Sequence, residues 1–322
     1  MPRLITFPGQ GTPVLGHVFN SYLAQRSPAI LAGDHARLVA KQIEQTPGEP
    51  ASIVACSFLL YKIHCSENRG NNASRVFLGH SLGELSCLAA GNSLFTLQQA
   101  MAIAHYRNSL MLQAVAQQQG AREYSMWAIS APKAKSLAND VRRLIKLQPK
   151  GSSVALANIN TDQQCVVSGT AEDFEHWQVR LRGIVGRCKI SRLKNPYRLP
   201  FHNPQVLAPI GEPLLSYMWE NLKDQGLQTL KTLDHPMICN LTGGQVTDVH
   251  DALERFAYGS CNVVEFVKCC ETVNSLDITE ALHIGPSNVI GKLVAKNCQI
   301  RKSEVWNEYM GADPQATIPP LE

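Results

Sequence analysis

The stretch VFLGHSLGEL, residues 76–85, places a serine in a spacing that favours nucleophilic catalysis. Ser81 stands between Gly79 and Gly83 in a Gly-x-Ser-x-Gly pattern. An apolar run precedes this serine and a helical pattern follows it, which predicts a strand–turn–helix that exposes the hydroxyl at a helix N-terminus. Such a serine serves enzymes that hydrolyse esters and enzymes that pass acyl groups between carriers. The pattern therefore predicts acyl chemistry at Ser81 and leaves the acceptor open.

A serine hydroxyl needs a base to take its proton, and the chain has ten histidines that compete for this role. His80 adjoins Ser81, and because neighbours at a sharp turn project apart, we interpret it as loop support. His202 lies in the proline-rich stretch NPYRLPFHNP, whereas His283 ends the apolar run EALHIGP. An α/β-hydrolase carries its base at the latter kind of position, with an acid such as Asp248. The residue pattern slightly favours His283 and leaves His202 open.

Arg107 is a charged residue on a face that should be buried. With a helical period of 3.6, it shares its face with Ile103, Ala104, Leu110, Met111 and Ala114. A buried guanidinium needs a partner. The partner is either a protein carboxylate or a substrate carboxylate, which the planar two-pronged guanidinium suits. A hydrolase of plain esters has no use for such a group near its serine.

The N-terminal stretch FPGQGT offers backbone N–H groups at Gln10 and Gly11. Together with the N–H of Leu82, which follows the serine, the Gln10 amide would complete an oxyanion hole. The alternative for this stretch is a plain glycine turn after a strand.

The elements that position these residues follow an α/β pattern. Strands are predicted over residues 3–7, 75–78, 236–243 and 280–285. Helices are predicted over 27–45, 50–64, 81–90, 96–119, 203–225 and 288–297, with further helices near 250–275. The 50–64 helix has a proline in its first turn, and Thr96 and Gln99 have capping-box spacing. Short apolar strands that alternate with helices indicate a parallel sheet with crossovers, as in an α/β-hydrolase-like domain.

In residues 126–192 the predicted order of elements changes to β-α-β-β-α-β, which is the order of a ferredoxin-like unit. We therefore predict a small inserted domain over 124–194 and a large domain over 1–123 and 195–322. The tail from residue 310 has too little apolar content to pack and is expected to be loose.

Composition excludes several classes of protein. The chain has 322 residues, 44% of them apolar, and a net charge of +4. No apolar run approaches the roughly 20 residues that span a bilayer, so we expect no membrane anchor. Aromatic residues do not interleave with basic ones, which gives no case for nucleic acid. Ten scattered cysteines without a C-x-x-C pair indicate reduced, buried thiols, and neither a metal site nor a cofactor is expected.

One basic run stands out. Its members are Arg180, Arg182, Arg187, Lys189, Arg192 and Lys194. A solvated face is the simple interpretation, and a docking patch for an acidic partner is the sharper one.

Taken jointly, the motifs resemble those of the malonyl-CoA:acyl carrier protein transacylase family, and in detail those of its fungal mitochondrial members. The resemblance runs from residue 3 to about 298. It is carried by FPGQG at 7–11, GHSLGE at 79–84, YRNSLM with Arg107 and Met111, NINTDQQCVVSG, FHN at 201–203 and HIGPSNV near 283.

The resemblance implies roles for the matched positions. Ser81 would carry the acyl group and His202 would be the base, oriented by backbone carbonyls without a third acid, which leaves His283 a strand-end residue. Arg107 would bind the malonyl carboxylate, and Gln10 and Leu82 would supply the oxyanion-hole amides. Met111 and Phe201 would line the acyl pocket.

The resemblance also implies the reaction. Malonyl would pass from malonyl-CoA to Ser81 and then to the phosphopantetheine thiol of an acyl carrier protein, in a ping-pong reaction of type II fatty acid synthesis. The resemblance alone implies a location in the mitochondrial matrix, and we expect a monomer. The cytoplasm is the alternative location, because the N-terminus reads as neither a secretion signal nor a transit peptide. The rival functions are a serine esterase or thioesterase, and a carrier-binding subunit with a vestigial site.

Three departures from the family pattern stand out. Thr12-Pro13 replaces a second glutamine, Phe201 stands where a serine often precedes the histidine, and YGSCNVVEF lacks a glutamine common in the loop that orients the histidine. Phe201 narrows or reshapes the acyl pocket. The YGSCNVVEF loop could still orient the histidine through its backbone without the missing glutamine.

Overall fold

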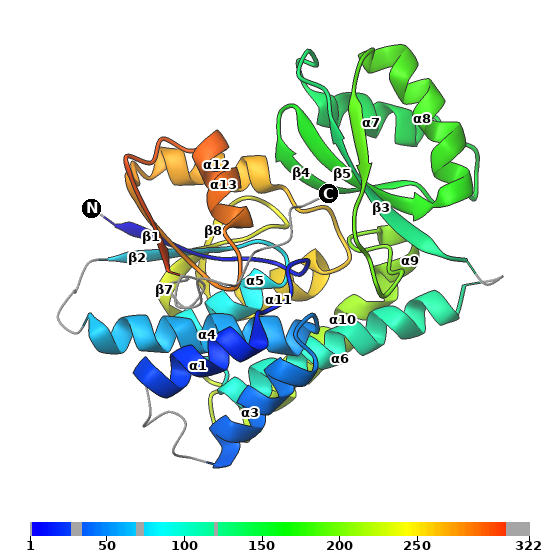
Figure 1. The fold of residues 1–322 in the computed structure, drawn as a ribbon. Coiled ribbons are helices and arrows are strands. Elements are labelled where there is room, and N and C mark those ends of the chain that lie inside the picture. Colours follow the sequence, from blue (N-terminus) through cyan, green and yellow to red (C-terminus); the bar gives the residue numbers. More distant parts are fainter. Residues whose placement is uncertain (1, 27–33, 69–73, 119–121, 307–322) are drawn as a thin grey trace. The chain divides into compact units, whose positions relative to one another are not determined.

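The computed structural model describes residues 2–26, 34–68, 74–118 and 122–306. The chain divides into two compact units (Figure 1). The first comprises Met1–His105, Ile278–Lys292 and Ile300–Glu322, and the second Tyr106–Asp277 and Leu293–Gln299. The predicted boundaries at 123/124 and 194/195 stay a prediction.

The first unit holds a parallel sheet whose strands lie in the order β10-β9-β1-β2. The bounds are β1 Arg3–Phe7, β2 Arg75–Gly79, β9 Glu280–Ile284 and β10 Lys302–Trp306. β1, β2 and β9 are short apolar runs that are almost wholly buried, as parallel strands covered on both faces are. These three strands were predicted. β10 was not predicted, because its sequence KSEVW has no apolar run. It is the edge strand of the sheet.

The helices of the first unit include the predicted 50–64 helix. The bounds are α1 Gly16–Arg26, α3 Asp34–Gln45, α4 Pro50–Glu67, α5 Gly83–Ser86 and a π-helix η1 Cys87–Gly91, while α6 Leu97–Ala116 and α13 Val289–Asn297 cross the unit boundary. Figure 1 shows α1, α3 and α4 on the same side of β1 and β2. The capping box at the start of α6 is confirmed: the Thr96 N–H donates to Gln99 Oε1 at 3.0 Å, and the Gln99 N–H donates to Thr96 Oγ1 at 3.3 Å.

The second unit contains a four-stranded antiparallel sheet with two helices. Its elements are β3 Tyr124–Ser130, α7 Leu137–Lys146, β4 Ala155–Thr161, β5 Gln164–Thr170, α8 Ala171–Val185 and β6 Lys189–Arg192. The strand order β4-β5-β3-β6 and the antiparallel pairings are those of a ferredoxin-like unit. The predicted β-α-β-β-α-β order is therefore confirmed.

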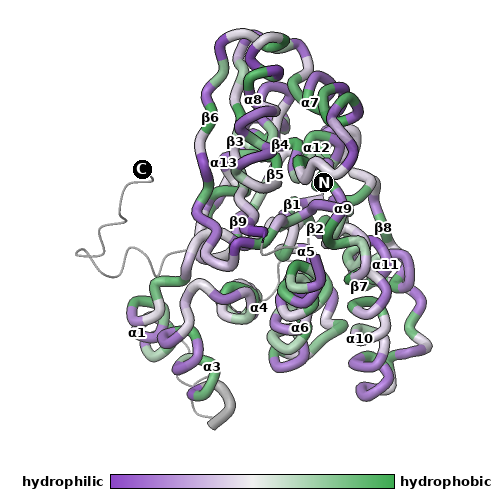
Figure 2. Tube along the Cα trace, turned by 90° about the vertical axis from the view of Figure 1, so that its right-hand side faces the viewer, coloured by the Kyte–Doolittle hydropathy of each residue, from purple (hydrophilic) through white to green (hydrophobic). Residues whose placement is uncertain are grey.

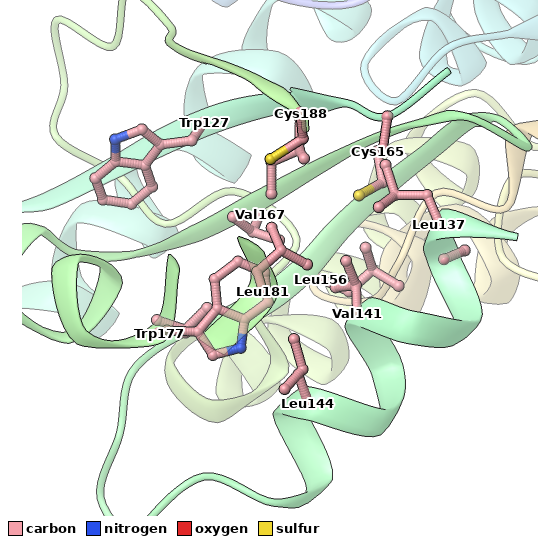
Figure 3. Close-up of a cluster of buried hydrophobic side chains, with 14 of the residues drawn as sticks. Trp127, Leu137, Val141, Leu144, Leu156, Cys165, Val167, Trp177, Leu181 and Cys188 are labelled. Atoms are coloured by element: carbon pink, nitrogen blue, oxygen red, sulfur yellow. The ribbon is translucent and has the colours of Figure 1, made fainter. Parts of the chain in front are cut away.

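Alternation along the strands gives this sheet two apolar faces. Both α7 and α8 carry hydrophobic and hydrophilic residues along their length (Figure 2). Their hydrophobic side chains pack with Trp127 and other strand residues in the core shown in Figure 3. Met126 and Ala128, the neighbours of Trp127, belong to a cluster on the opposite face, as the period of two requires.

The rest of the second unit is largely helical. Its elements are α9 Pro204–Leu207, a 3-10 helix η2 Ala208–Ile210, α10 Gly211–Asp224, β7 Thr232–Ile238, β8 Gln245–Asp248, α11 Val249–Gly259 and α12 Phe266–Ser275. The single helix predicted over 203–225 is thus divided into two short helices and the longer α10. Pro204, Pro209 and Pro213 account for the breaks, because proline fits the first turn of a helix and disrupts its interior.

The predicted fold class is confirmed, since a parallel sheet with helices accompanies a separate antiparallel sheet. All ten cysteines are free thiols, and eight of them are buried, as predicted. No helix among the described residues is long and apolar enough to cross a membrane. The expectation of a loose tail from residue 310 lies outside the described residues.

Candidate active site

Ser81 lies at a sharp turn between a buried strand and a helix. β2 ends at Gly79, and α5 begins at Gly83. The backbone of Ser81 has φ of 52°, a left-handed conformation that non-glycine residues seldom adopt. The turn is closed by the Glu84 N–H, which donates to the Ser81 carbonyl at 3.0 Å. Strained backbone of this kind is the mark of a nucleophile elbow.

The loop after β1 is packed tightly against this elbow. The His80 N–H donates to the Phe7 carbonyl at 3.0 Å. A Cβ on Gly83 would lie 2.2 Å from the Phe7 oxygen, and a Cβ on Gly9 would lie 2.5 Å from the His80 oxygen. Both glycines are required because the two backbones approach each other too closely for any side chain.

The close approach of the two backbones fixes the positions of the backbone amides of Gln10 and Leu82. Gln10 comes directly after Gly9, and Leu82, which is fully buried, comes directly after Ser81. Within the described ranges, neither the Gln10 N–H nor the Leu82 N–H donates a hydrogen bond. Two ordered backbone donors of this kind are what an oxyanion hole needs.

His202 lies in the second unit, in the turn before α9, where it is 3% exposed and has φ of 59°. Its Nδ1–H donates to the carbonyl oxygens of Gly259 at 3.0 Å and of Asn262 at 2.9 Å. Because Nδ1 carries the proton, the neutral ring has its lone pair at Nε2, where a base needs it. Two backbone carbonyls thus orient the ring without a carboxylate, which is the geometry that the family resemblance implied.

Asn203 fixes the turn that carries His202. Its side-chain oxygen accepts a hydrogen bond from the Gln205 N–H at 3.1 Å and so caps α9. Its Nδ2 donates to the Ser153 carbonyl at 2.9 Å, and its side chain is fully buried. Asn203 therefore stabilises the left-handed conformation of His202.

Arg107 is 1% exposed, as its place on the apolar helix face predicted. Its Nε donates to Ser260 Oγ at 2.8 Å. Ile103, Ala104 and Met111 on the same face are fully buried too. A buried guanidinium that a hydroxyl orients through Nε has the chemistry to bind a carboxylate.

Met111 and Phe201 share a hydrophobic cluster in the second unit. Met111 is fully buried there with Tyr124 and Leu199, and the partly buried Phe201 ring packs against the same cluster. The ring also packs against Met126 and its neighbours on the small sheet. Phe201, which directly precedes His202, therefore packs against both clusters.

His283 and Asp248, the pair required by the hydrolase alternative, serve the structure instead. His283 is buried at the end of β9, where Nδ1 bonds Thr6 Oγ1 at 2.7 Å and Nε2 bonds Ser303 Oγ at 3.0 Å. Burial lowers the pKa of His283 to about 4. Asp248 caps α11 by accepting a hydrogen bond from the Asp251 N–H at 2.9 Å. Both ring nitrogens of His283 are thus engaged in hydrogen bonds within the first unit, which disfavours His283 as the base.

Comparison with known proteins decides the family. No family model matches the chain. The mitochondrial malonyl CoA-acyl carrier protein transacylase of Saccharomyces cerevisiae is 35% identical, and the match covers 92% of each chain. The chain belongs to this transacylase family. The resemblance that the motifs indicated is thereby confirmed.

Solved transacylase structures share the fold. The malonyl-CoA:acyl carrier protein transacylase of Helicobacter pylori has a TM-score of 0.78 at 20% identity, with 97% of each chain covered. A malonyl-transacylase solved in complex with its type II PKS acyl-carrier protein has a TM-score of 0.67 at 19% identity and covers 97% of this chain and 100% of that one. At these identities the likeness concerns the fold alone.

Each unit of this transacylase brings part of the predicted site together. Gln10, Ser81 and Leu82 lie at one loop–elbow junction in the first unit, whereas Arg107 and His202 meet residues 259–262 in the second. Sequence reasoning missed Ser260, because a lone serine after a helical run carries no signal. It also missed Asn203, although Asn-Pro before a helix is a recognisable cap.

Proposed function

We propose that the chain transfers malonyl from malonyl-CoA to the phosphopantetheine thiol of an acyl carrier protein in type II fatty acid synthesis. The observation that carries the proposal is the His202 ring held by the carbonyls of Gly259 and Asn262 in a chain of this family. A carboxylate-free base of this kind matches a Ser-His dyad, whereas the rival esterase would need His283.

In the first half-reaction, His202 Nε2 takes the proton of Ser81 Oγ, and the oxygen attacks the malonyl thioester. The Gln10 and Leu82 amides stabilise the oxyanion that forms. CoA leaves as the thiol after receiving the proton from His202, and a malonyl-serine ester remains. The two carbonyls on Nδ1 stabilise the imidazolium formed in this step, since both accept from a protonated nitrogen.

In the second half-reaction, His202 takes the proton of the carrier thiol, and the sulfur attacks the malonyl-serine carbonyl. The same amides bind the second oxyanion, and Ser81 leaves with the proton returned from His202. A ping-pong sequence follows, because one serine accepts and then releases the acyl group.

Arg107 is proposed to select malonyl by pairing with its free carboxylate. A charge-assisted hydrogen bond of this kind is worth about 1.5–3 kcal/mol. This corresponds to a preference over acetyl of roughly 10- to 200-fold. The burial of Arg107 supports the role, since a buried cation gains most from an anionic ligand.

An acyl carrier protein is the proposed partner, in keeping with the printed names of the yeast relative and of the solved transacylase complex. The basic run supplies the proposed docking patch. Its six residues, Arg180, Arg182, Arg187, Lys189, Arg192 and Lys194, are all exposed, and they lie on the second half of α8, the turn after it, and the edge strand β6 and its flank. Figure 2 shows hydrophilic residues along β6.

Charge reversal tests the patch. Replacing Arg187 and Lys189 with glutamate should raise the KM for the carrier several-fold and leave the KM for malonyl-CoA unchanged. The effect should weaken as the salt concentration rises. An unchanged carrier KM at low salt would remove the patch from docking.

We propose a mitochondrial location because the yeast relative bears that description. The matrix, with the cytoplasm as the alternative, and a monomeric state are proposed with it. Imaging of a tagged full-length protein and light scattering of the purified chain test these points.

The function is tested by following CoA release and carrier loading together. Malonyl-CoA should give a burst of CoA equal to the enzyme concentration, and further turnover should require a carrier that bears phosphopantetheine. Steady release of malonate into water without a carrier would indicate a thioesterase. No burst at all would indicate a vestigial site.

A further inference from the structure

Residues 259–262 comprise the last residue of α11 and the turn after it, and they contact both Arg107 and His202. We infer that Ser260 is a positioning residue that sets the orientation of the Arg107 guanidinium for the acyl carboxylate. This inference rests on the proposed function and deepens it, because it identifies a residue that orients Arg107 for the selection of the acyl group.

The hydroxyl of Ser260 has a defined direction. It donates to the Phe256 carbonyl at 2.9 Å, one helical turn back in α11. A hydroxyl has one proton, so its lone pairs face the Arg107 Nε–H, which donates to it at 2.8 Å. Ser260 is 2% exposed, so water does not compete for either bond. One buried hydroxyl thus joins the guanidinium to the C-terminal turn of α11.

This bond decides which edge of the guanidinium meets a ligand. With Nε directed at Ser260, the donors that would bind a carboxylate end-on, in two parallel hydrogen bonds, are Nη1 and Nη2. The C-terminal turn of α11 also carries partial negative charge, which stabilises a cation beside it. Consistent with this proximity, the Arg107 charge opposes the burial that raises the pKa of the neighbouring Cys261 thiol.

The turn itself is anchored independently of Ser260. The Val264 N–H donates to the Ala157 carbonyl at 2.9 Å, and the Ile159 N–H donates to the Val264 carbonyl at 2.9 Å. Glu265 forms an ion pair with Arg142 on α7. Loss of the Ser260 hydroxyl should therefore leave the carbonyls of Gly259 and Asn262 in place on His202.

A plain helix-capping role is the competing explanation. Ser260 is the C-cap of α11, and its hydroxyl accounts for one bond within that helix. If this were its whole role, Ser260→Ala would change stability and would act equally on every substrate. The two explanations differ in whether the effect passes through Arg107.

A double-mutant cycle separates them. We would measure kcat and KM for malonyl-CoA in the wild type, Ser260→Ala, Arg107→Ala and the double variant, with a thermal melt and a pH–rate profile for each. Ser260→Ala should raise KM about 5- to 50-fold with an unchanged pH profile, since an unsatisfied buried donor remains beside the ligand. In the Arg107→Ala background the same change should have an effect of less than about twofold.

Ser275→Ala is the matched control. Ser275 ends α12 and also donates to a helical carbonyl, that of Thr272 at 2.9 Å, but it contacts no arginine in the described structure. Its loss should change neither KM nor kcat. Ser260→Thr, which keeps the hydroxyl, should recover most of the malonyl KM.

The outcomes distinguish this inference from the function on which it rests. A wild type that loads no malonyl onto a carrier would contradict the proposed function itself. A normal wild type with equal Ser260→Ala effects in both backgrounds, or with a shifted pH profile, would contradict the role of Ser260.

Discussion

The Gly259 carbonyl accepts a hydrogen bond from His202 Nδ1 at 3.0 Å, where a Ser-His-Asp enzyme has a carboxylate. A carbonyl is neutral, so it orients the ring with less stabilisation of the imidazolium than a buried anion gives. No side-chain substitution can remove it. The orientation of His202 is therefore set by backbone atoms at the end of α11 and just after it.

The first prediction separates the two histidines. His202→Ala should lower the rate of Ser81 acylation by about 10²- to 10⁴-fold, the usual contribution of a general base. His283→Gln, which keeps hydrogen-bonding atoms near Thr6 and Ser303, should leave the rate close to that of the wild type. Stopped-flow CoA release measures both, and the reverse order of effects would support the hydrolase alternative.

The second prediction concerns the junction between loop and elbow. Gly83→Ala would bring a methyl group to 2.2 Å from the Phe7 carbonyl, so the loop that carries Gln10 must move. We expect acylation to fall by about 10²- to 10³-fold, the effect of losing one oxyanion donor.

Gly183→Ala in α8 is the matched control for this change. Nothing lies within 4 Å of its added Cβ, so it should leave acylation unchanged and raise stability by up to about 1 kcal/mol. Circular dichroism would verify that both variants are folded. A folded Gly83→Ala variant with normal acylation would contradict the assigned junction.

The third prediction concerns stability at acid pH. The folded pKa of His283 is about 4, below its unfolded value near 6.5, because burial disfavours the charged ring. The unfolded chain therefore binds more protons between these values, and stability falls as the pH drops from 6.5 towards 4. Between pH 7 and 5 the loss from this residue should be about 2 kcal/mol.

Urea unfolding at pH 7 and pH 5 measures this loss. His283→Gln should show a smaller decrease than the wild type by about that amount. Some decrease will remain, because burial, together with the Arg3 and Arg75 cations, also lowers the pKa of His64 to about 4. An equal decrease in the variant would mean that His283 does not titrate in this way.

The fourth prediction concerns acyl selection. Arg107→Ala should reduce the preference for malonyl-CoA over acetyl-CoA by roughly 10- to 200-fold, chiefly through a higher KM for malonyl-CoA. Arg107→Lys should recover only part of the preference, because an ammonium lacks the planar pair of donors. Steady-state assays with both thioesters measure this, and an unchanged preference in Arg107→Ala would remove Arg107 from carboxylate binding.

The fifth prediction concerns the support of the base. Asn203→Asp keeps an oxygen to cap α9 but loses the donor to the Ser153 carbonyl, and it places a charge in a buried site. We expect a loss of about 2–4 kcal/mol in stability and a lower kcat. Gln205→Ala, which keeps its backbone N–H on the cap, is the control and should be nearly neutral.

Much of the fold followed from local pattern. The apolar strands, the proline at the start of α4, the Thr96 cap and the ferredoxin-like strand order all carry signals within a few residues. The π-helix after α5 and the strand β10 carried none, because SLGELSCLAA reads as one helix and KSEVW as polar loop.

The residues of the candidate site likewise differ in whether the local sequence carries a signal for them. Arg107 was predictable because a charge interrupts an apolar helix face, and Ser81 because its glycines permit a close approach. The carbonyls of Gly259 and Asn262 were not predictable as partners of His202 from the residues alone, since backbone atoms leave no trace in residue type. The choice between His202 and His283 came from the family resemblance, and the hydrogen bonds of His283 to Thr6 and Ser303 agree with it.

The most direct test of the account is intact-protein mass spectrometry in two steps. After malonyl-CoA alone, we expect one malonyl group on the wild type, located on Ser81 by peptide mapping and absent from Ser81→Ala. After addition of a carrier that bears phosphopantetheine, the group should leave the enzyme and appear on the carrier. Labelling that survives Ser81→Ala, or loss of the group to water at the same rate without a carrier, would contradict the account.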